Sequence, residues 1–163
     1  DYRHDVDVCQ RFAARNRVRM LVEILARTGL DASSEFHTVH NYIDVDEMVL
    51  RKGVIAAHAG ETVLIPLNMR DGSIIAKGRG NEAWNNSAPH GAGRVMSRRE
   101  ARETLDLREY RTAMEGIYST SVNERTIDEA PGAYKPIEDI IGPIADAVDI
   151  IDVMRPIYNF KAS

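Results

Sequence analysis

The chain has 163 residues, a length that corresponds to one domain rather than several. Hydrophobic residues make up 44% and charged residues 28% of it, a composition that excludes disordered, collagen-like and disulfide-rich proteins. The formal net charge of -4 excludes nucleic-acid binding through an overall positive charge, so any such contact requires a local basic patch.

The sequence predicts a cytoplasmic protein with no membrane contact. No apolar run approaches the ~18 residues of a membrane-spanning helix, and the N-terminus lacks the basic and then apolar order of a signal peptide. The single Cys9 cannot form an internal disulfide, and we expect a buried, unreactive thiol. Because the chain begins with Asp1 directly inside a helical pattern, we also expect it to be a fragment of a longer protein.

The first predicted element is an amphipathic helix over residues 5–27. Its apolar side chains recur at three- and four-residue spacing, and the helix is expected to end near Gly29. From Phe36 to Ala76, short apolar and β-branched runs separated by glycine and proline predict strands. Residues 78–93 hold four glycines and almost no periodicity, which predicts a long loop.

Helical patterns dominate the second half of the chain. The spacing of Ser97 and Glu100 predicts a capping box at the start of a helix that reaches Leu105. Further helices are predicted over 107–117 and 136–148, an extended segment over 119–122, and a final strand over 150–157. Strands and helices do not alternate regularly, so we predict one α+β domain over residues 1–163, with mixed strands in its N-terminal half flanked by helices.

The predicted loop contains a histidine beside two glycines and an arginine. Backbone N–H groups in a loop of this composition can bind an anion, and Arg94 and the positive end of the helix after Ser97 would add to that binding. A neutral imidazole can attack phosphorus and form a phosphoramidate. These features predict a polyphosphate site with His90 as the nucleophile. The alternative is a loop histidine that caps a turn.

Two further groups of residues are candidates for binding. His37 and His40 lie three apart in a predicted strand, so their side chains should point to opposite faces and not chelate one ion. His40, followed by Asn41, is the better candidate ligand of the two. The basic turn at residues 51–53 could contact a nucleic-acid backbone, although two adjacent cations are also compatible with solvated surface.

Taken together, several segments resemble the C-terminal part of the RtcB-type RNA-splicing ligases. These enzymes join RNA 3′-phosphate or 2′,3′-cyclic-phosphate ends to 5′-hydroxyl ends with GTP and manganese. The matching segments occur in the family's order and cover nearly the whole chain. They are His40-Asn41, Arg51 to Gly53, Pro66 to Ser73, Ala88 to Arg94 with Met96 to Arg98, Ala133 to Lys135 and Asn159 to Lys161.

The resemblance implies roles for individual residues. His90 matches the guanylylated histidine, and His40 matches a manganese ligand. The positions that match guanylate-binding residues are Asn41, Pro66, Leu67, Asn68, Met69, Ser73, Gly91, Ala92, Gly93, Tyr134 and Lys161. We expect Arg94, Arg51 and Lys52 to contact phosphate or RNA. The implied cofactors are GTP and Mn²⁺, the implied substrate is RNA ends, and the implied fold is RtcB-like.

The sequence departs from the family pattern in two places. A Pro-Gly-Ser-Met-Gly run is common where this chain has Pro66 to Arg70. The family's other metal ligands, an aspartate with a cysteine and two histidines, lie N-terminal to the matched segments, and Cys9 does not match them. We therefore expect the chain alone to be an incomplete ligase that needs the missing N-terminal portion. Two alternatives stay open: a module that binds GTP or RNA ends without turnover, and a metal-dependent phosphohydrolase.

Overall fold

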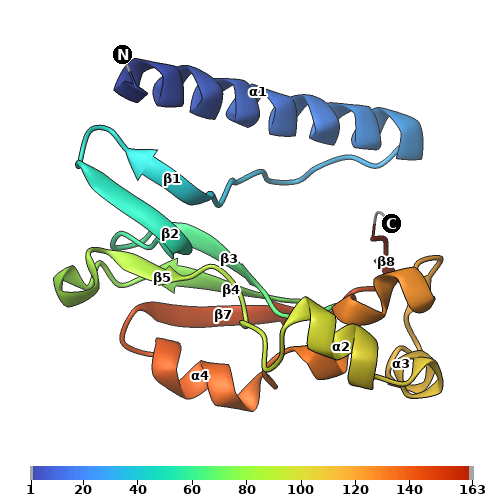
Figure 1. Cartoon of the computed structure of the whole chain (residues 1–163). Coiled ribbons are helices and arrows are strands. Elements are labelled where there is room, and N and C mark those ends of the chain that lie inside the picture. Colours follow the sequence, from blue (N-terminus) through green and yellow to red (C-terminus); the bar gives the residue numbers. More distant parts are fainter. Residues whose placement is uncertain (1, 162–163) are drawn as a thin grey trace.

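The computed structural model describes residues 2–161 (Figure 1). The helical elements, in chain order, are α1 (Tyr2–Thr28), η1 (Glu82–Trp84), α2 (Arg98–Thr104), α3 (Leu107–Ala113), η2 (Glu124–Glu129), η3 (Pro131–Ala133) and α4 (Glu138–Ile144), where η marks a 3₁₀ helix. The strands are β1 (His40–Asp44), β2 (Val49–Ala56), β3 (Thr62–Pro66), β4 (Ser73–Gly78), β5 (Ser87–Pro89), β6 (Tyr118–Ser119), β7 (Val148–Met154) and β8 (Tyr158–Asn159).

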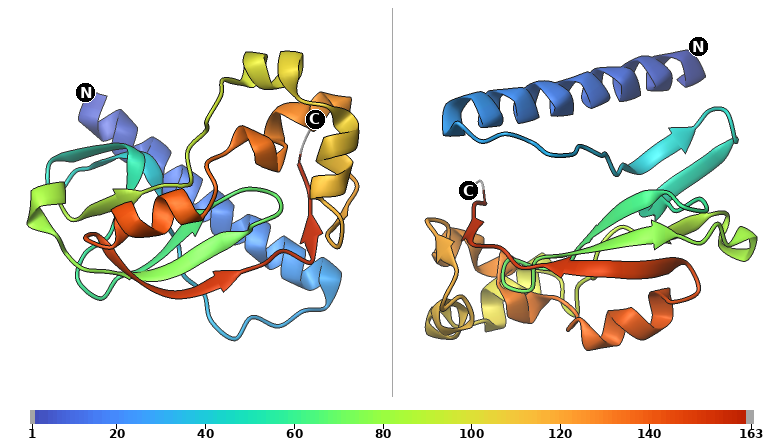
Figure 2. Two further views of the ribbon diagram at one scale, coloured as in Figure 1. Left: turned by 90° about the horizontal axis from the view of Figure 1, so that it is seen from below. Right: turned by 180° about the vertical axis from the view of Figure 1, so that it is seen from behind.

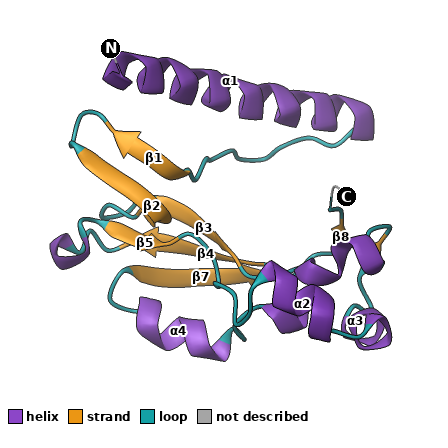
Figure 3. Cartoon of the chain, in the orientation of Figure 1, coloured by secondary structure: helices purple, strands orange, loops and turns teal. Residues whose placement is uncertain are grey.

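The strands form two antiparallel sheets and one short parallel pair. One sheet has the order β1–β2–β5, the other has the order β3–β4–β7, and β6 pairs with β8. Helices lie on the outside of these sheets (Figure 3). The predicted α+β class is confirmed, and β1 to β4 lie in the N-terminal half as expected, whereas β5 to β8 lie in the C-terminal half.

Two clusters of buried side chains hold these layers together. The larger joins the sheets to α4, whose Ile140 and Ile144 pack with Ile65 and Ile74. The alternation of buried and exposed positions along β4 places Ile74 in this cluster, as a strand with one covered face requires. The smaller cluster contains Met69 and residues of α3 and η2. Each fully buried aliphatic side chain contributes about 1.5–3 kcal/mol to folding.

Helix α1 differs from the other long elements because no residue of it is buried. It lies on the opposite side of the sheets from α4 (Figures 1 and 2). The helix predicted over residues 5–27 is confirmed in position, because α1 spans these residues. Cys9 is exposed, however, so the expectation of a buried thiol is wrong. Within residues 2–161, nothing covers the side of the helix that carries Phe12. Gln10 joins α1 to the edge of β1, exchanging two hydrogen bonds with the backbone of Ile43 at 2.8 and 3.0 Å.

The segment predicted as a long loop contains one ordered strand. β5 pairs with β2 and places Ala88, which is fully buried, opposite Ile55. A strand of three residues is too short to show alternation in the sequence, which is why the prediction missed it. β5 matters for the site because it ends one residue before His90.

The C-terminal elements are shorter than or shifted from their predicted ranges. The capping box of α2 is present, with both the Ser97 and Glu100 side chains bonded to backbone N–H groups. α4 occupies only seven residues of the predicted 136–148, and Pro143 lies in its last turn. β7 begins and ends earlier than predicted, since Pro156 has no N–H to donate to a sheet. No helix within residues 2–161 meets the length and apolar character that a membrane crossing requires.

Candidate nucleotide site

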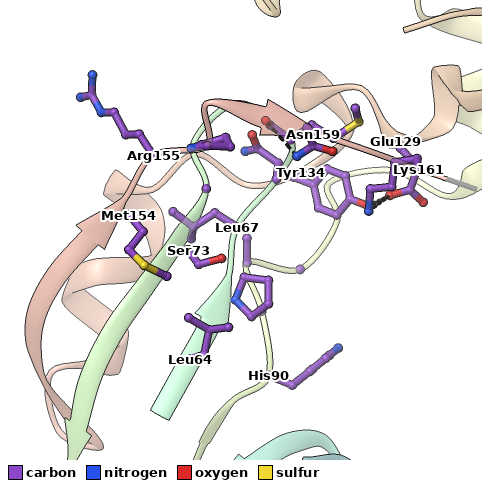
Figure 4. A pocket seen from close by; sticks show the side chains of 18 of the residues that line it. Leu64, Leu67, Ser73, His90, Glu129, Tyr134, Met154, Arg155, Asn159 and Lys161 are labelled. Carbon is purple, nitrogen blue, oxygen red and sulfur yellow. Dashed lines mark hydrogen bonds and ion pairs between the residues drawn. The ribbon is translucent and has the colours of Figure 1, made fainter. Parts of the chain in front are cut away.

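A cavity of about 950 Å³ opens where the ends of β3 and β4 meet the loop after β5, η2 and the C-terminal segment. This volume suits a nucleotide-sized ligand. Thirteen residues singled out from the sequence line it: His40, Pro66, Leu67, Asn68, Met69, Ser73, His90, Gly91, Ala92, Gly93, Arg94, Tyr134 and Lys161. Asn41, Arg51 and Lys52 are not among its lining residues. Figure 4 shows His90 at one end and Tyr134 and Lys161 at the other.

The backbone of β2 fixes the orientation of His90. The ring Nδ1 lies 2.5 Å from the carbonyl oxygen of Gly53. A carbonyl oxygen can only accept, so Nδ1 must carry the proton of this hydrogen bond. The neutral imidazole then has its lone pair on Nε2, and the His90 side chain is exposed at the pocket. This arrangement leaves Nε2 able to act as a nucleophile.

Gly53 is held in place by Asn41. The Gly53 N–H donates to Asn41 Oδ1 at 2.8 Å, while its carbonyl accepts from His90. Gly53 has a φ of 72°, a conformation that favours glycine, and Asn41 also has a positive φ of 56°. Asn41 was expected to contact guanylate. In the structure its side-chain oxygen supports the residue that orients His90, and its contact with guanylate stays a prediction.

The ring of His40 stacks on that of His90, with ring centroids 5.1 Å apart and planes 16° from parallel. His37 lies outside the strands, where its Nε2 is 3.0 Å from Glu35. Within residues 2–161, no group of three or more His, Cys, Asp or Glu residues could hold a metal ion. His40 can supply one nitrogen ligand beside His90, but a manganese ion needs several donors, so the described residues do not fit a complete site.

The loop between β3 and β4 forms one wall of the pocket. The Asn68 side chain closes its turn by accepting from the N–H groups of Arg70 and Asp71 at 3.0 and 2.9 Å. Leu67 and Met69 are 3% and 1% exposed, so their side chains belong to the core clusters. Asn68 thus stabilises the turn through its side-chain oxygen. Leu67 and Met69 offer the pocket mainly their backbone.

The loop after β5 packs tightly against this wall. Ala92 N–H donates to the carbonyl oxygen of Pro66 at 3.0 Å. A Cβ on Gly91 would lie 3.0 Å from the same oxygen, which explains the glycine there. The predicted anion nest is therefore only partly available, because the Ala92 N–H is already bonded. The capping box of α2 uses the N–H groups of Ser97 and Glu100, and the contribution of the α2 N-terminus to anion binding stays a prediction.

Arg94 and Tyr134 connect the two ends of the pocket. They form a β-bridge, and the Arg94 guanidinium carbon lies 4.9 Å from the centre of the Tyr134 ring. Arg94 donates to Tyr134 Oη at 3.1 Å and to the carbonyl oxygen of Asp128 at 2.5 Å. Arg94 lines the pocket as expected, but these contacts direct much of its hydrogen bonding to the protein itself.

A charged network forms the far end of the pocket. Glu129 Oε2 accepts from Tyr134 Oη at 2.6 Å and pairs with Lys161 Nζ at 3.2 Å (Figure 4). Burial and the carboxylate of Glu129 raise the pKa of Tyr134 to about 12. Burial alone would raise the pKa of Glu129, but bonds from Tyr134, Lys161 and Arg98 lower it below its usual value. Tyr134 is thus neutral and Glu129 anionic at neutral pH.

Arg51 contradicts its predicted role in phosphate or RNA contact. Its side chain is 0% exposed and makes five hydrogen bonds. The acceptors are Ser87, Tyr42, Asp44, Glu47 and the Asn85 carbonyl. A guanidinium has five N–H donors, so no donor remains for a phosphate. The next side chain, Lys52, points to the opposite face of β2 and is exposed, so it remains available for a contact with phosphate or RNA.

The sequence interpretation missed two groups that shape this site. The Gly53 carbonyl carries no sequence signal, because any residue has one. Glu129 has no recognisable motif spacing, although the arginines at 98, 99 and 102 and the acidic pair at 128–129 are complementary in charge. That complementarity could have suggested the pairing of α2 with η2, which is found in the ion pairs of Arg98 and Arg102 with Asp128.

Comparison with known proteins identifies the family to which the chain belongs. Residues 1–162 match the protein family described as tRNA-splicing ligase RtcB. The chain is 32% identical to the RNA-splicing ligase RtcB of Escherichia coli K12, over 99% of this chain and 43% of that protein. It is 34% identical to the tRNA-splicing ligase RtcB of Aeropyrum pernix, over 96% of this chain and 31% of that protein. The chain thus spans less than half the length of these curated relatives.

Proposed function

Because the chain belongs to the RtcB family of tRNA-splicing ligases, we propose that it forms the nucleotide-binding part of an RNA ligase with His90 as the nucleophile. The observation that carries this proposal is the hydrogen bond between His90 Nδ1 and the Gly53 carbonyl. It leaves the Nε2 lone pair free at a pocket large enough for a nucleotide. A histidine that merely capped a turn would have no need of such a pocket.

The proposed reaction has three steps. His90 Nε2 attacks the α-phosphorus of GTP, so that a P–N bond forms and pyrophosphate leaves. An RNA 3′-phosphate oxygen then attacks the same phosphorus, which transfers GMP and restores the free imidazole. Finally the 5′-hydroxyl of a second RNA end attacks the activated 3′-phosphate, and GMP leaves as the phosphodiester forms.

The far end of the pocket suits the guanine base. Tyr134 offers an aromatic face, and Lys161 offers an ammonium group to the O6 and N7 acceptors of guanine. Ser73, at the start of β4, and the backbone of residues 66–69 lie between this end and His90, where the ribose would sit. Support for this placement comes from the order of these residues along one cavity (Figure 4).

We also propose that the whole protein uses manganese together with GTP. A divalent ion would supply Lewis acidity beside the transferred phosphate. In this chain His40 would contribute one ligand, and the remaining donors must come from beyond residues 2–161. RNA ends are the proposed partners, with the exposed Lys52 as a backbone contact.

Transfer of label from GTP tests the proposal. The chain is incubated with α-labelled GTP and manganese, with and without the N-terminal part of the Escherichia coli relative. We expect acid-labile label on the protein that His90→Ala abolishes, while the control His37→Ala keeps it. His37 is a suitable control because it is exposed and lies outside the pocket.

The same experiment separates the competing functions. Nucleotide bound without covalent label would favour a binding module that has no turnover. Release of free phosphate without label would favour a phosphohydrolase. Label that persists in the His90→Ala variant would show that another residue is the nucleophile.

A further inference from the structure

Glu129 connects three separate segments of the chain at the far end of the pocket. It is the last residue of η2, and its side chain is 12% exposed. Its carboxylate bonds with Tyr134 after η3, with Lys161 near the C-terminus, and with Arg98 of α2. Arg94 lies further away, with Nη1 3.9 Å from Glu129 Oε1. The carboxylate thus lies among four side chains that are donors or cations.

Lys161 is held at both its backbone and its side chain. Its N–H donates to Ser121 Oγ at 2.9 Å, and its carbonyl accepts from the same hydroxyl at 3.0 Å. Its ammonium group lies 3.2 Å from Glu129 Oε2. A free lysine side chain has many rotamers and binds as a mobile point charge. The pair with Glu129 therefore selects one position for the ammonium group inside the pocket.

The two partners of Glu129 Oε2 are the same two side chains that the base would contact. Tyr134 donates its hydroxyl proton to that oxygen at 2.6 Å, which fixes the ring as well. Guanine presents acceptors at O6 and N7, whereas adenine presents an amino donor at the position of O6. A fixed ammonium group can discriminate between these two edges. A mobile one can move to N7, which both bases share.

We propose that Glu129 is a positioning residue that sets the preference of this site for guanine over adenine nucleotides. It acts through Lys161 and Tyr134 and does not itself touch the reacting phosphorus. This inference rests on the proposed function, because it assumes that the pocket binds a guanine nucleotide.

Equilibrium binding of labelled GTP and ATP to the 163-residue chain tests the inference. We expect wild type to prefer GTP, and Glu129→Gln to reduce the ratio of GTP to ATP affinity at least tenfold. Glu129→Asp, which keeps the carboxylate on a shorter side chain, should have a ratio of GTP to ATP affinity between those of wild type and Glu129→Gln. The control Glu124→Gln, at an exposed position of the same 3₁₀ helix, should leave the ratio unchanged.

A double-mutant cycle identifies the route through Lys161. Lys161→Gln alone should reduce the ratio of GTP to ATP affinity as Glu129→Gln does. The double variant should show no further reduction beyond that of Lys161→Gln. Equal preference in wild type and Glu129→Gln, with both folded by circular dichroism, would overturn the inference and leave the proposed function intact. Absence of any preference for GTP in wild type would overturn both.

A second measurement needs no nucleotide. Side-chain carbon relaxation should show restricted motion of Lys161 in the wild-type chain and fast motion in Glu129→Gln. A residue that only stabilised the fold would change the unfolding midpoint without changing this motion. Fast motion of Lys161 in both proteins would contradict the positioning role.

Discussion

A buried charged residue belongs to the supporting contacts of each end of the pocket, and the two charges have opposite signs. Arg51, two residues before the Gly53 that orients His90, is 0% exposed and pairs with Asp44 and Glu47. Asp128, next to the Glu129 that bonds Tyr134, is 2% exposed and pairs with Arg98 and Arg102. In both cases the ion pairs and hydrogen bonds offset the cost of taking a charge out of water.

The ends differ in how their functional side chains are held. His90 makes its hydrogen bond to a backbone carbonyl and stays exposed beside His40. Tyr134 and Lys161 are instead bound directly to Glu129, next to the buried charge. The Tyr134 end is therefore preformed by side-chain contacts. The His90 end is open to further groups, as the proposed transfer between two RNA ends would require.

The largest effect is expected when the buried cation is removed. Arg51→Met should lower the free energy of unfolding by about 3 kcal/mol, because Asp44 and Glu47 lose their partner. Urea denaturation measures this change. Lys52→Met, at the exposed neighbouring position, is the matched control and should change stability by less than ~0.5 kcal/mol. Equal losses in the two variants would show that Arg51 does not anchor the sheet.

A smaller loss is expected at the buried anion. Asp128→Asn keeps the shape of the side chain but removes its charge, and Arg98 and Arg102 are largely exposed and remain hydrated. We expect a loss of about 1 kcal/mol in the same assay. A loss larger than that of Arg51→Met would reverse the comparison between the two ends.

The charge of Asp128 also predicts a dependence of stability on pH. Burial alone would raise the pKa of Asp128, but bonds from Arg98 and Arg102 hold it below its usual value. Its contribution to stability is therefore complete above the ordinary aspartate pKa of about 3.9 and is lost as the pH falls through the lower folded value. Wild type should lose more stability than Asp128→Asn between about pH 5 and pH 2. Parallel curves for the two proteins would contradict this.

The smallest expected effect is a change in the ionisation of Tyr134, which is observed by ultraviolet absorption. The phenol of Tyr134 should ionise at a pKa of about 12, and Tyr134→Phe should remove that transition from an ultraviolet titration. Glu129→Gln should lower the Tyr134 pKa, because the carboxylate raises it. A Tyr134 pKa that does not change in Glu129→Gln would indicate that burial alone determines it.

The sequence predicted the elements with strong local signals. The capping box of Ser97 and Glu100 and the long periodic helix α1 lie where their patterns placed them. Ordered matching segments also identified thirteen of the residues that line the pocket. These signals depend on neighbours in the chain, so one sequence is enough to reveal them.

The failures involve contacts between distant segments. Arg51 was expected at the surface because it was assigned with Lys52 to a basic turn, but its partners come from β1, the turn after it, and the start of β5. Cys9 was expected in a core, yet it is exposed, because α1 packs so loosely that none of its residues is buried. The hydrogen bond from His90 to Gly53 spans 37 residues and involves a backbone oxygen, which no side-chain pattern reveals.

We propose that His90 reacts through Nε2, because Gly53 holds the proton on Nδ1. Nitrogen and phosphorus NMR of the protein after reaction with GTP, manganese and the N-terminal part of the Escherichia coli relative tests this directly. We expect one phosphoramidate, with GMP bonded to Nε2 of His90. A bond to Nδ1, or to any other residue, would contradict it.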